Sequence, residues 1–369
     1  MRVLQTLPAL NSGGVERGTV EFARELVRHG HESIVLSSGG RLVPQLEAEG
    51  SRHISRPVHR KSLASFGQIR PVRRLLRELK PDVVHVRSRM PAWILWLAWR
   101  GLPENERPAL VSTFHGMYSV NAYSAIMARP RHLIAISRCV ERYILDNYRV
   151  APDRITVIQR GVDTRAFSPE PPDQDWVEAL YSEYPELQGR KLVLMPGRLT
   201  RWKGQEAFLD MMADLSRRDP AVHGVVVGGA EKNKKSYLAE LEEKTASLGL
   251  DQHITFAGHR SDIVQFYRLA DVVCHMSSKP EPFGRTLTEA LAVGTPVVAF
   301  DRGGAAESLS ACFPEGLVPA DDLSAFAGRV HHLLDQQPQI EVHPEFRLDH
   351  QVQATLDVYQ RALAGAGRP

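Results

Sequence analysis

The chain has 369 residues, of which 43% are apolar and 24% charged, and its formal net charge is +3 at pH 7. This length has room for two domains of ordinary size, and the composition excludes a wholly disordered or fibrous protein. No apolar run reaches the ~18 residues that span a bilayer, and the first residues lack the pattern of a secretion signal, so we expect a cytoplasmic protein. The three cysteines lie far apart without metal-ligand spacing, which is typical of reduced thiols.

The charge is distributed unevenly along the chain. Residues 1–170 contain 26 Lys and Arg against 15 Asp and Glu, whereas residues 171–369 contain 20 against 28. A basic first half indicates contact with something anionic, but no recognised nucleic-acid-binding motif occurs. The segment 71–80 places arginines beside leucines at helical spacing, which predicts an amphipathic helix with a cationic face. This face is either solvated or a surface for anionic lipid headgroups or a phosphorylated acceptor.

Short β-branched runs alternate with longer helical patterns. In the first half we expect strands at 3–7, 33–37, 83–86, 110–114, 133–136 and 155–158, and helices at 15–28, 42–49, 71–79, 91–100 and 138–147. In the second half we expect strands at 192–195, 224–227, 254–257, 272–276, 296–300 and 316–318, and helices at 204–217, 235–247, 261–269, 284–292 and 323–334. This alternation predicts two doubly wound domains with parallel sheets, because twelve strands in one sheet would be unusual.

The segment 168–190 is rich in Pro and acidic residues and interrupts the alternation. We therefore predict a Rossmann-like domain at 1–168, a linker at 169–190 and a second Rossmann-like domain at 191–348. One more helical pattern follows at 349–363. We expect the segment 349–369 to form a C-terminal helix that packs back toward the first domain.

The first motif with chemical content is Asn11-Ser12-Gly13-Gly14, between the first expected strand and helix. Paired glycines let the backbone approach a ligand closely, and the start of the following helix offers N–H groups to an anion. A full dinucleotide fingerprint is absent, and a tight turn without a ligand explains the motif equally well.

A second motif, GRLTRWKG at 197–204, directly follows the first strand of the second domain. The carboxyl end of a parallel strand is where doubly wound folds bind ligands. Arg198 and Lys203 lie on a turn that enters a helix and can clamp a diphosphate from two sides, although two ordinary surface cations fit the same pattern.

The most informative segment is EPFGRTLTEA, residues 281–290. Its helix begins near Gly284 and can present unpaired N–H groups to phosphates. Glu289 lies about 12 Å from Glu281 at a rise of ~1.5 Å per residue, which is comparable to the span from a sugar across a diphosphate to a ribose. One carboxylate can then hold sugar hydroxyls and the other ribose hydroxyls. The alternative is a loop acid and a helix acid without a ligand.

Glu281 and Glu289 form an E-x7-E motif that resembles the signature of retaining nucleotide-sugar glycosyltransferases of family 4, which have the GT-B fold. Four other segments resemble that family and occur in its order: GGVE near the start, HG after a strand of the first domain, GVDTRAF before the linker and GRLTRWKG after it. The resemblance implies an α/β protein with two doubly wound Rossmann-like domains facing a central cleft. The first domain would lie on the acceptor side and the second would bind the nucleotide sugar.

The resemblance also implies which side chains act on the donor. His115 would face the donor sugar, Glu281 would contact that sugar, and Arg198 and Lys203 would neutralise the departing diphosphate. Cations and N–H groups placed in advance at a departing phosphate stabilise its developing charge. The resemblance implies a metal-independent enzyme, so we expect no metal and no cofactor besides the nucleotide sugar. The resemblance further implies front-face attack in place of a carboxylate nucleophile.

Other residues would border the donor. Gly13 and Gly14 would lie near its phosphates and the acceptor, and Glu289 would bind the ribose. The remaining residues implied by the resemblance lie on later loops of the second domain, namely Gly228, Gly229, Gly258, Arg260 (through its backbone), Phe283, Gly284, Arg285 and Thr286. Two positions depart from the family pattern: Arg160 replaces a common Asn, and Arg285 replaces a frequent aliphatic residue and can add a phosphate or acceptor contact.

The segment 114–127 resembles bacterial members that build lipopolysaccharide core or related envelope glycans. We therefore expect a retaining, metal-independent hexosyltransferase that acts on an anionic glycan or glycolipid. Its basic first domain would contact the cytoplasmic face of the inner membrane peripherally. Two alternatives stay open: a nucleotide-sugar 2-epimerase on the same fold, and a non-catalytic protein that binds nucleotide sugars.

Overall fold

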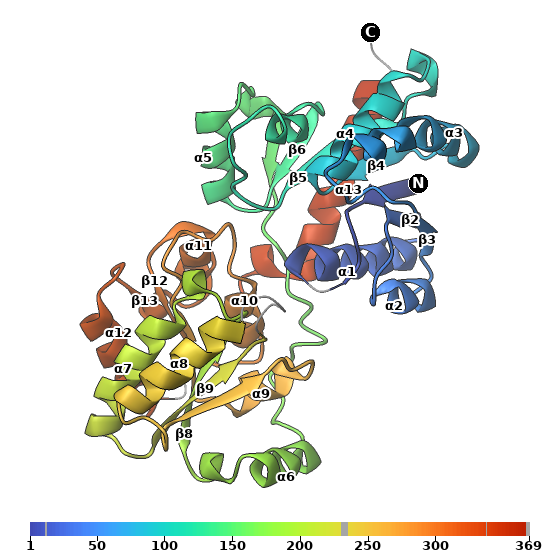
Figure 1. The fold of residues 1–369 in the computed structure, drawn as a ribbon. Coiled ribbons are helices and arrows are strands. Elements are labelled where there is room, and N and C mark those ends of the chain that lie inside the picture. Colours follow the sequence, from blue (N-terminus) through green and yellow to red (C-terminus); the bar gives the residue numbers. More distant parts are fainter. Residues whose placement is uncertain (12, 230–234, 337, 367–369) are drawn as a thin grey trace. The chain divides into compact units, whose positions relative to one another are not determined.

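The computed structural model describes residues 1–11, 13–229, 235–336 and 338–366 (Figure 1). The chain divides into two compact units. Met1–Gln159 and the segment that begins at Asp349 form the first unit, and Arg160–Leu348 form the second. Each unit contains one sheet, and all strand pairs in both sheets are parallel. Within the described ranges, no helix has the length and apolar composition needed to cross a bilayer.

The first unit is built on a seven-stranded sheet of order β3-β2-β1-β4-β5-β6-β7. Its strands are β1 (Arg2–Thr6), β2 (Glu32–Ser37), β3 (Arg52–Ser55), β4 (Val83–Val86), β5 (Ala109–Phe114), β6 (His132–Ala135) and β7 (Ile155–Val157). Its helices are α1 (Gly14–Arg28), α2 (Val43–Ala48), α3 (Ile69–Leu79), α4 (Arg89–Arg100), α5 (Arg138–Asn147) and α13 (Leu348–Ala366). Strands β4 and β5 are buried along their whole length, as a parallel sheet covered on both faces requires.

Helix α13 completes the first unit although it lies at the other end of the sequence. Its Tyr359 is fully buried, and the hydroxyl oxygen lies 2.6 Å from Nδ1 of His85 on β4. The Tyr359 ring also meets the Phe22 ring of α1 edge-on, with 6.1 Å between the centroids. The red helix therefore lies among blue elements in Figure 1, and it supplies part of the core between β4 and α1.

The second unit is built on a six-stranded sheet of order β10-β9-β8-β11-β12-β13. Its strands are β8 (Lys191–Pro196), β9 (Val222–Val227), β10 (Ile254–Gly258), β11 (Val272–His275), β12 (Val297–Phe300) and β13 (Leu317–Val318). Its helices are α6 (Gln174–Glu183), α7 (Gln205–Arg218), α8 (Lys235–Ser247), α9 (Ile263–Leu269), α10 (Arg285–Ala292), α11 (Gly303–Cys312) and α12 (Leu323–Leu333). Both sheets thus share one connection pattern, with the first strand of each lying between its second and its fourth.

The chain enters and leaves the second unit at adjacent points. The N–H of Val162 donates to the carbonyl of Phe346 at 2.9 Å, and the N–H of Leu348 donates back to the carbonyl of Val162 at 3.0 Å. Gly161 lies directly against the segment 346–348, because a Cβ there would be 2.4 Å from the Leu348 Cα. The two crossings between the units are therefore held side by side by main-chain hydrogen bonds.

Three regular elements are absent from the sequence-based expectations. Strand β3, RHIS, is an edge strand with no fully buried side chain, so it lacks an apolar run. Helix α6 lies inside the segment 169–190 that the sequence marks as a linker, and it begins where the Asp173 carboxylate accepts from the N–H of Trp176. Helix α11 has the sequence GGAAESLSAC, whose small residues give little apolar periodicity. The segment 169–190 belongs to the second unit.

Candidate active site

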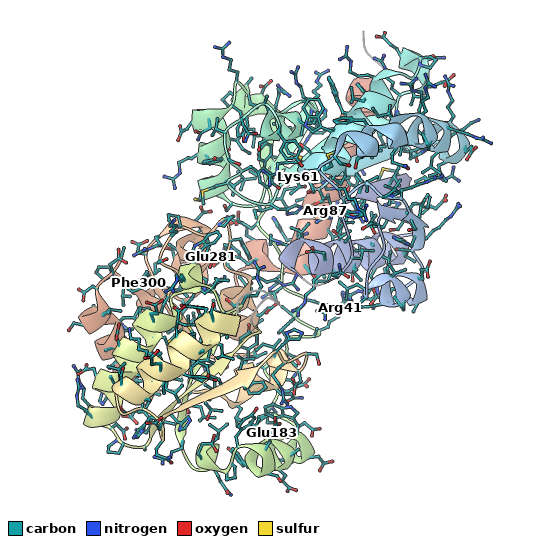
Figure 2. All side chains as sticks on the ribbon, in the orientation of Figure 1. Arg41, Lys61, Arg87, Glu183, Glu281 and Phe300 are labelled. Carbon is teal, nitrogen blue, oxygen red and sulfur yellow. The ribbon has the colours of Figure 1, made fainter. Side chains whose placement is uncertain are left out.

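The loops that follow neighbouring strands of the second unit meet at the carboxyl edge of its sheet. From β8 the chain proceeds through β9 and β10 on one side and then crosses to β11 on the other. Such a switch point is where open parallel sheets leave a crevice that binds ligands. The motif at 197–204 follows β8, and Glu281, labelled in Figure 2, follows β11. The two strongest sequence motifs of this unit therefore lie on the two strands that flank the switch point.

Lys203 and Glu281 form an ion pair across this switch point. The Lys203 Nζ lies 2.6 Å from Oε1 of Glu281, and the Ser277 hydroxyl donates to the same oxygen. The Glu281 side chain is buried, with 8% of the residue exposed. Burial acts to raise the pKa of its carboxyl, but His275, Lys203 and Ser277 together outweigh burial, so the pKa is lowered. The site therefore holds a negative charge that is fixed in position at neutral pH.

His275 is the last residue of β11 and lies beside this ion pair. Its Nε2 is 3.5 Å from Oε1 of Glu281, and its Nδ1 is 3.5 Å from Oγ1 of Thr286. Burial lowers the pKa of His275 to about 4, against the opposing attraction of Glu281. The ring is therefore neutral at pH 7, where Lys203 and Ser277 keep Glu281 ionised. The sequence analysis did not select His275, although its position at the end of a strand just before the Glu281 loop is a usable signal.

Two glycines allow the loops to approach one another closely. Gly204 precedes α7 with a φ of +85°, and a Cβ there would lie 2.0 Å from the carbonyl oxygen of Met276 at the end of β11. Gly228 follows β9, and a Cβ there would lie 1.7 Å from the carbonyl oxygen of Gly197. Only glycine fits either position, so these residues bring the loops of three strands into contact.

Further main-chain hydrogen bonds tie the same loops together. The N–H of Gly228 donates to the Gly258 carbonyl at 2.8 Å, and the N–H of Leu199 donates to the Gly229 carbonyl at 3.2 Å. Arg198 directly precedes Leu199 and is exposed. The predicted nucleotide-border residues Gly228, Gly229 and Gly258 are thus neighbours of the predicted diphosphate cation Arg198.

Helix α10 begins between the two carboxylates of the E-x7-E motif. Gly284 is its N-cap, and its carbonyl accepts from the N–H of Leu287 at 3.0 Å. The first N–H groups of a helix have no carbonyl partner within that helix, so the backbone of 284–286 can donate to a phosphate. The buried Phe283 ring packs on the Phe346 ring, with 6.3 Å between centroids. This packing anchors the loop and leaves the Phe283 backbone to contact a donor.

Glu289 lies one turn after the first residue of α10 and is almost fully buried. Its Oε1 accepts from Nε of Arg285 at 2.7 Å, and its Oε2 accepts from the Tyr267 hydroxyl at 3.1 Å. A carboxylate oxygen can accept more than one hydrogen bond, so both contacts are compatible with added ribose hydroxyls. Arg285 is therefore an ion-pair partner that orients Glu289 in this structure. Tyr267, which the sequence analysis did not select, holds the second oxygen.

The Arg260 side chain is engaged away from the loops just described. Its Nη2 lies 2.8 Å from Oδ2 of Asp262, and its Nη1 lies 3.0 Å from Oε2 of Glu183 on α6. Arg260 lowers the pKa of the Asp262 carboxyl to about 2 through this hydrogen bond, against the effect of burial. The guanidinium thus has a structural role, and the backbone is the part of Arg260 that can border a nucleotide.

The remaining predicted residues belong to the first unit, so they form a separate group. His115 directly follows β5, and its Nε2 accepts from Nε of Arg87 at 3.4 Å. Gly13 caps α1, and its carbonyl accepts from the N–H of Arg17 at 3.0 Å; Gly14 is the first residue of that helix. Each of these residues follows the carboxyl end of a strand, as ligand-binding residues of doubly wound folds do.

In the described part of the chain, no group of three or more His, Cys, Asp and Glu side chains can hold a metal ion. A diphosphate can instead be held by the cations Arg198 and Lys203 and by the N–H donors at the start of α10.

Two family models match the chain. Residues 12–166 match "Glycosyltransferase Family 4", and residues 179–346 match "Glycosyl transferases group 1". The lipopolysaccharide core biosynthesis mannosyltransferase LpsB of Rhizobium meliloti (strain 1021) is 32% identical over 187 residues, which are 50% of this chain and 52% of the relative. The chain thus aligns with about half the length of that curated relative.

Solved structures resemble the chain over nearly its full length. The crystal structure of a glycosyltransferase from Rickettsia africae ESF-5 is 29% identical, has a TM-score of 0.84 and covers 98% of each chain. The structure of Anabaena HepE in complex with UDP and glucose is 23% identical, has a TM-score of 0.76 and covers 99% of this chain and 94% of that chain. The latter likeness concerns the fold alone.

Proposed function

Since the chain belongs to the family 4 glycosyltransferases with the GT-B fold, we propose that it transfers a hexose-type sugar from a nucleoside-diphosphate sugar to a glycan or glycolipid of the cell envelope. One observation carries this proposal: the Lys203–Glu281 ion pair, 2.6 Å long, lies at the switch point of the second sheet. Lys203 and Glu281 are held there near the start of α10. In a bound sugar diphosphate, the cation and the helix start would contact the phosphates, and the carboxylate would contact the sugar.

The chemistry of the transfer explains this charge arrangement. The bond between the anomeric carbon and the diphosphate oxygen breaks, so negative charge develops on the phosphate and positive charge on the sugar. Lys203, Arg198 and the N–H groups at the start of α10 would stabilise the departing diphosphate because they are in place before the reaction. Removing one such preorganised group typically costs about 100- to 1,000-fold in rate. These groups supply the stabilisation that a metal ion gives in other transferases.

The proposed stereochemical outcome is retention. The acceptor hydroxyl would attack from the face that the diphosphate leaves, and its proton would pass to the departing phosphate oxygen. The carboxylate of Glu281 would hold sugar hydroxyls and attract the positive charge of the sugar in the transition state, without forming a bond to it. Glu289, oriented by Arg285 and Tyr267, would bind the ribose.

Two relatives support the proposed substrates. Anabaena HepE, which has the same fold, was crystallised with UDP and glucose, and this supports a nucleotide sugar as donor. LpsB of Rhizobium meliloti is named as a lipopolysaccharide core mannosyltransferase, and this supports an envelope glycan as acceptor. The basic first half of the sequence adds support for an anionic acceptor at the cytoplasmic face of the inner membrane.

The direct test is a transfer assay with UDP-, GDP- and ADP-sugars and an envelope glycolipid extract. We expect release of the nucleoside diphosphate, and we expect Glu281→Gln and Lys203→Ala each to lower kcat/KM by about 100-fold or more. Lys191→Ala is the matched control. Lys191 also pairs with carboxylates, Asp219 and Asp335, but it lies at the opposite end of β8.

Three outcomes would contradict the proposal. Full activity in Lys203→Ala would show that the Lys203–Glu281 ion pair has no role in transfer. Isomerisation of the sugar nucleotide without any acceptor would establish a 2-epimerase instead. Tight binding of a sugar nucleotide with no turnover on any envelope acceptor would establish a non-catalytic binding protein.

A further inference from the structure

Three cations of the first unit surround one loop, residues 115–124. The Lys61 Nζ lies 5.3 Å from the centroid of the Tyr123 ring, and the guanidinium carbon of Arg89 lies 5.4 Å from the same centroid. Arg89 also lies 4.8 Å from the centroid of the Tyr118 ring, and Nη1 of Arg89 donates to the Ser124 hydroxyl at 3.2 Å. The loop thus has a cationic side.

Arg87 is the buried member of this group. It is 4% exposed, its Nε donates to His115, and its Nη1 donates to Oε1 of Gln5 at 2.6 Å. Burial lowers the pKa of Arg87 to about 10, so the guanidinium keeps its charge at neutral pH. Lys61 and Arg87 are both labelled in Figure 2.

A buried guanidinium normally pairs with a carboxylate, because burying an uncompensated charge is costly. Among the described residues, none forms an ion pair with Lys61, Arg87 or Arg89. The carboxylate of Glu21 acts on Arg87 only through longer-range attraction. The cluster is therefore built to have its charge compensated from outside the chain.

The position of the cluster in the fold points the same way. Arg87 follows β4, and its N–H donates to the Thr6 carbonyl at the end of β1, so it lies at the switch point of the first sheet. Arg89 is the first residue of α4, which has no acidic residue in its first turn and no side-chain cap from Ser88. A cation at the positive end of a helix is unfavourable unless an anion lies between them. An anion bound here would satisfy the helix and the arginines together.

We propose that Lys61, Arg87 and Arg89 bind a phosphate-type anionic group carried by the acceptor, and that this unit thereby selects a phosphorylated acceptor. The identification of the ligand as the acceptor rests on the proposed function. The binding of a phosphate group does not, because it requires no transfer. Arg87 and the helix start would hold the phosphate, while Lys61 and Arg89, steadied by the two tyrosine rings, would neutralise its remaining charge.

The binding test uses the full chain carrying Lys203→Ala, which weakens the predicted diphosphate site of the second unit. Thermal unfolding is followed with glycerol 3-phosphate, inorganic phosphate, and glycerol with chloride at equal ionic strength. A ligand that binds the folded form raises the melting temperature. We expect glycerol 3-phosphate to raise it the most, and Arg89→Gln and Lys61→Gln each to remove at least half of that rise.

Arg100→Gln is the matched control, because Arg100 ends the same helix and lies 4.7 Å from the Trp96 ring centroid. It should keep the full rise. An unchanged rise in both Arg89→Gln and Lys61→Gln, or an equal loss in Arg100→Gln, would overturn the proposal. If one variant of the cluster does not fold, the other decides. Stabilisation by inorganic phosphate equal to that by glycerol 3-phosphate would identify a site for the free ion and would overturn the acceptor assignment.

A kinetic readout separates this proposal from the proposed function. Where transfer is observed, Arg89→Gln should raise the acceptor KM and leave the donor KM unchanged. Unchanged acceptor kinetics in this variant would overturn the acceptor site while leaving the transferase intact. A complete absence of transfer, combined with the expected phosphate binding, would refute the proposed function and leave the anion site standing.

Discussion

The second unit buries both carboxylates of the E-x7-E motif and gives each of them partners. Glu281 keeps its negative charge because Lys203 and Ser277 both contact Oε1. Glu289 has one partner on each oxygen, Arg285 and Tyr267. Buried charges that are paired and hydrogen-bonded on every side hold one geometry, which is what a site for a developing charge requires.

Because His275 is buried and neutral, we expect the stability of the folded protein to depend on pH. Its pKa is about 4 in the folded protein and 6.5 in the unfolded chain, so between these values only the unfolded chain takes up the proton. Stability is therefore fully present above pH 6.5 and is lost as the pH falls toward 4. We expect His275 to account for a loss of about 2 kcal/mol in the free energy of unfolding between pH 7 and pH 5.

Urea unfolding of the protein at pH 7 and pH 5 tests this. His275→Gln should reduce the loss between the two pH values by about that amount, because Gln does not titrate. His332→Gln, at an exposed position of α12, is the control and should leave the loss unchanged. An identical loss in the wild type and in His275→Gln would show that the His275 ring is not the group that responds.

The sequence could identify Glu281 and Lys203 but not their partners. The two charged residues belong to motifs with recognisable spacing next to a strand end, so chemistry and position pointed to them. His275, Ser277 and Tyr267 carry no such pattern. Their contacts depend on β8 lying beside β11 and on α9 packing near α10, and such pairings are set by the tertiary fold. The roles assigned to the site residues stay predictions until variants are assayed.

At the scale of elements, the turn between β8 and α7 determines where the Lys203 ammonium lies. Residues Arg201–Lys203 form one 3-10 turn, and Gly204 then reverses into α7 with a left-handed backbone. This path is possible only because the Gly204 Cα lies against the Met276 carbonyl without a Cβ. The turn therefore links the end of β8 to the end of β11.

Gly204→Ala should destabilise the protein by about 3 kcal/mol, because a left-handed alanine and a clash with a backbone carbonyl add up. Gly249→Ala is the matched control. Gly249 has a similar φ of +69°, but no atom lies within 4 Å of its Cβ position, so only the strain of about 1 kcal/mol applies. The free energies of unfolding in urea measure both effects. Equal destabilisation by the two substitutions would contradict the close approach to Met276.

Most helices and strands were predictable from periodicity alone. The strand Val83–Val86 and the helices Arg138–Asn147 and Lys235–Ser247 have the predicted bounds. The strand is a buried run rich in Val, and the Ser137 side chain caps the start of Arg138–Asn147. Strand β3 escaped prediction because an edge strand need not be apolar. Helix α6 escaped because its Pro and acidic flanks resemble a linker in composition.

The whole molecule combines a basic first half with an acidic second half. In the structure, α3 buries Val72, Leu75, Leu76 and Leu79. Its Arg70, Arg74 and Arg77 are exposed, whereas Arg73 is half-buried and donates to the Ala98 carbonyl of α4. Arg70 and Arg74 of this helix line a pocket of ≈ 530 Å³ together with Arg56. A cationic face of this kind fits the anionic headgroups of a membrane surface.

We expect the protein to bind vesicles that contain phosphatidylglycerol and not vesicles of phosphatidylcholine alone. Each cation near such a surface contributes about 1 kcal/mol, so Arg70→Gln with Arg74→Gln should weaken binding by about 2 kcal/mol. Co-sedimentation at low and high salt measures this. The pair Arg217→Gln with Arg218→Gln, on α7 of the acidic unit, is the control. Equal weakening by both pairs would argue against α3 as the contact.

The return of α13 to the first unit has a consequence for how a ribosome makes this protein. The residues that fill the space beside His85 are translated after the whole of Arg160–Leu348. Until α13 is made, the core of the first unit lacks this helix. The second unit already has all of its strands at that stage and can fold. The order of maturation is thus reversed relative to the order of translation, and a premature stop codon just after residue 348 would damage the domain made first.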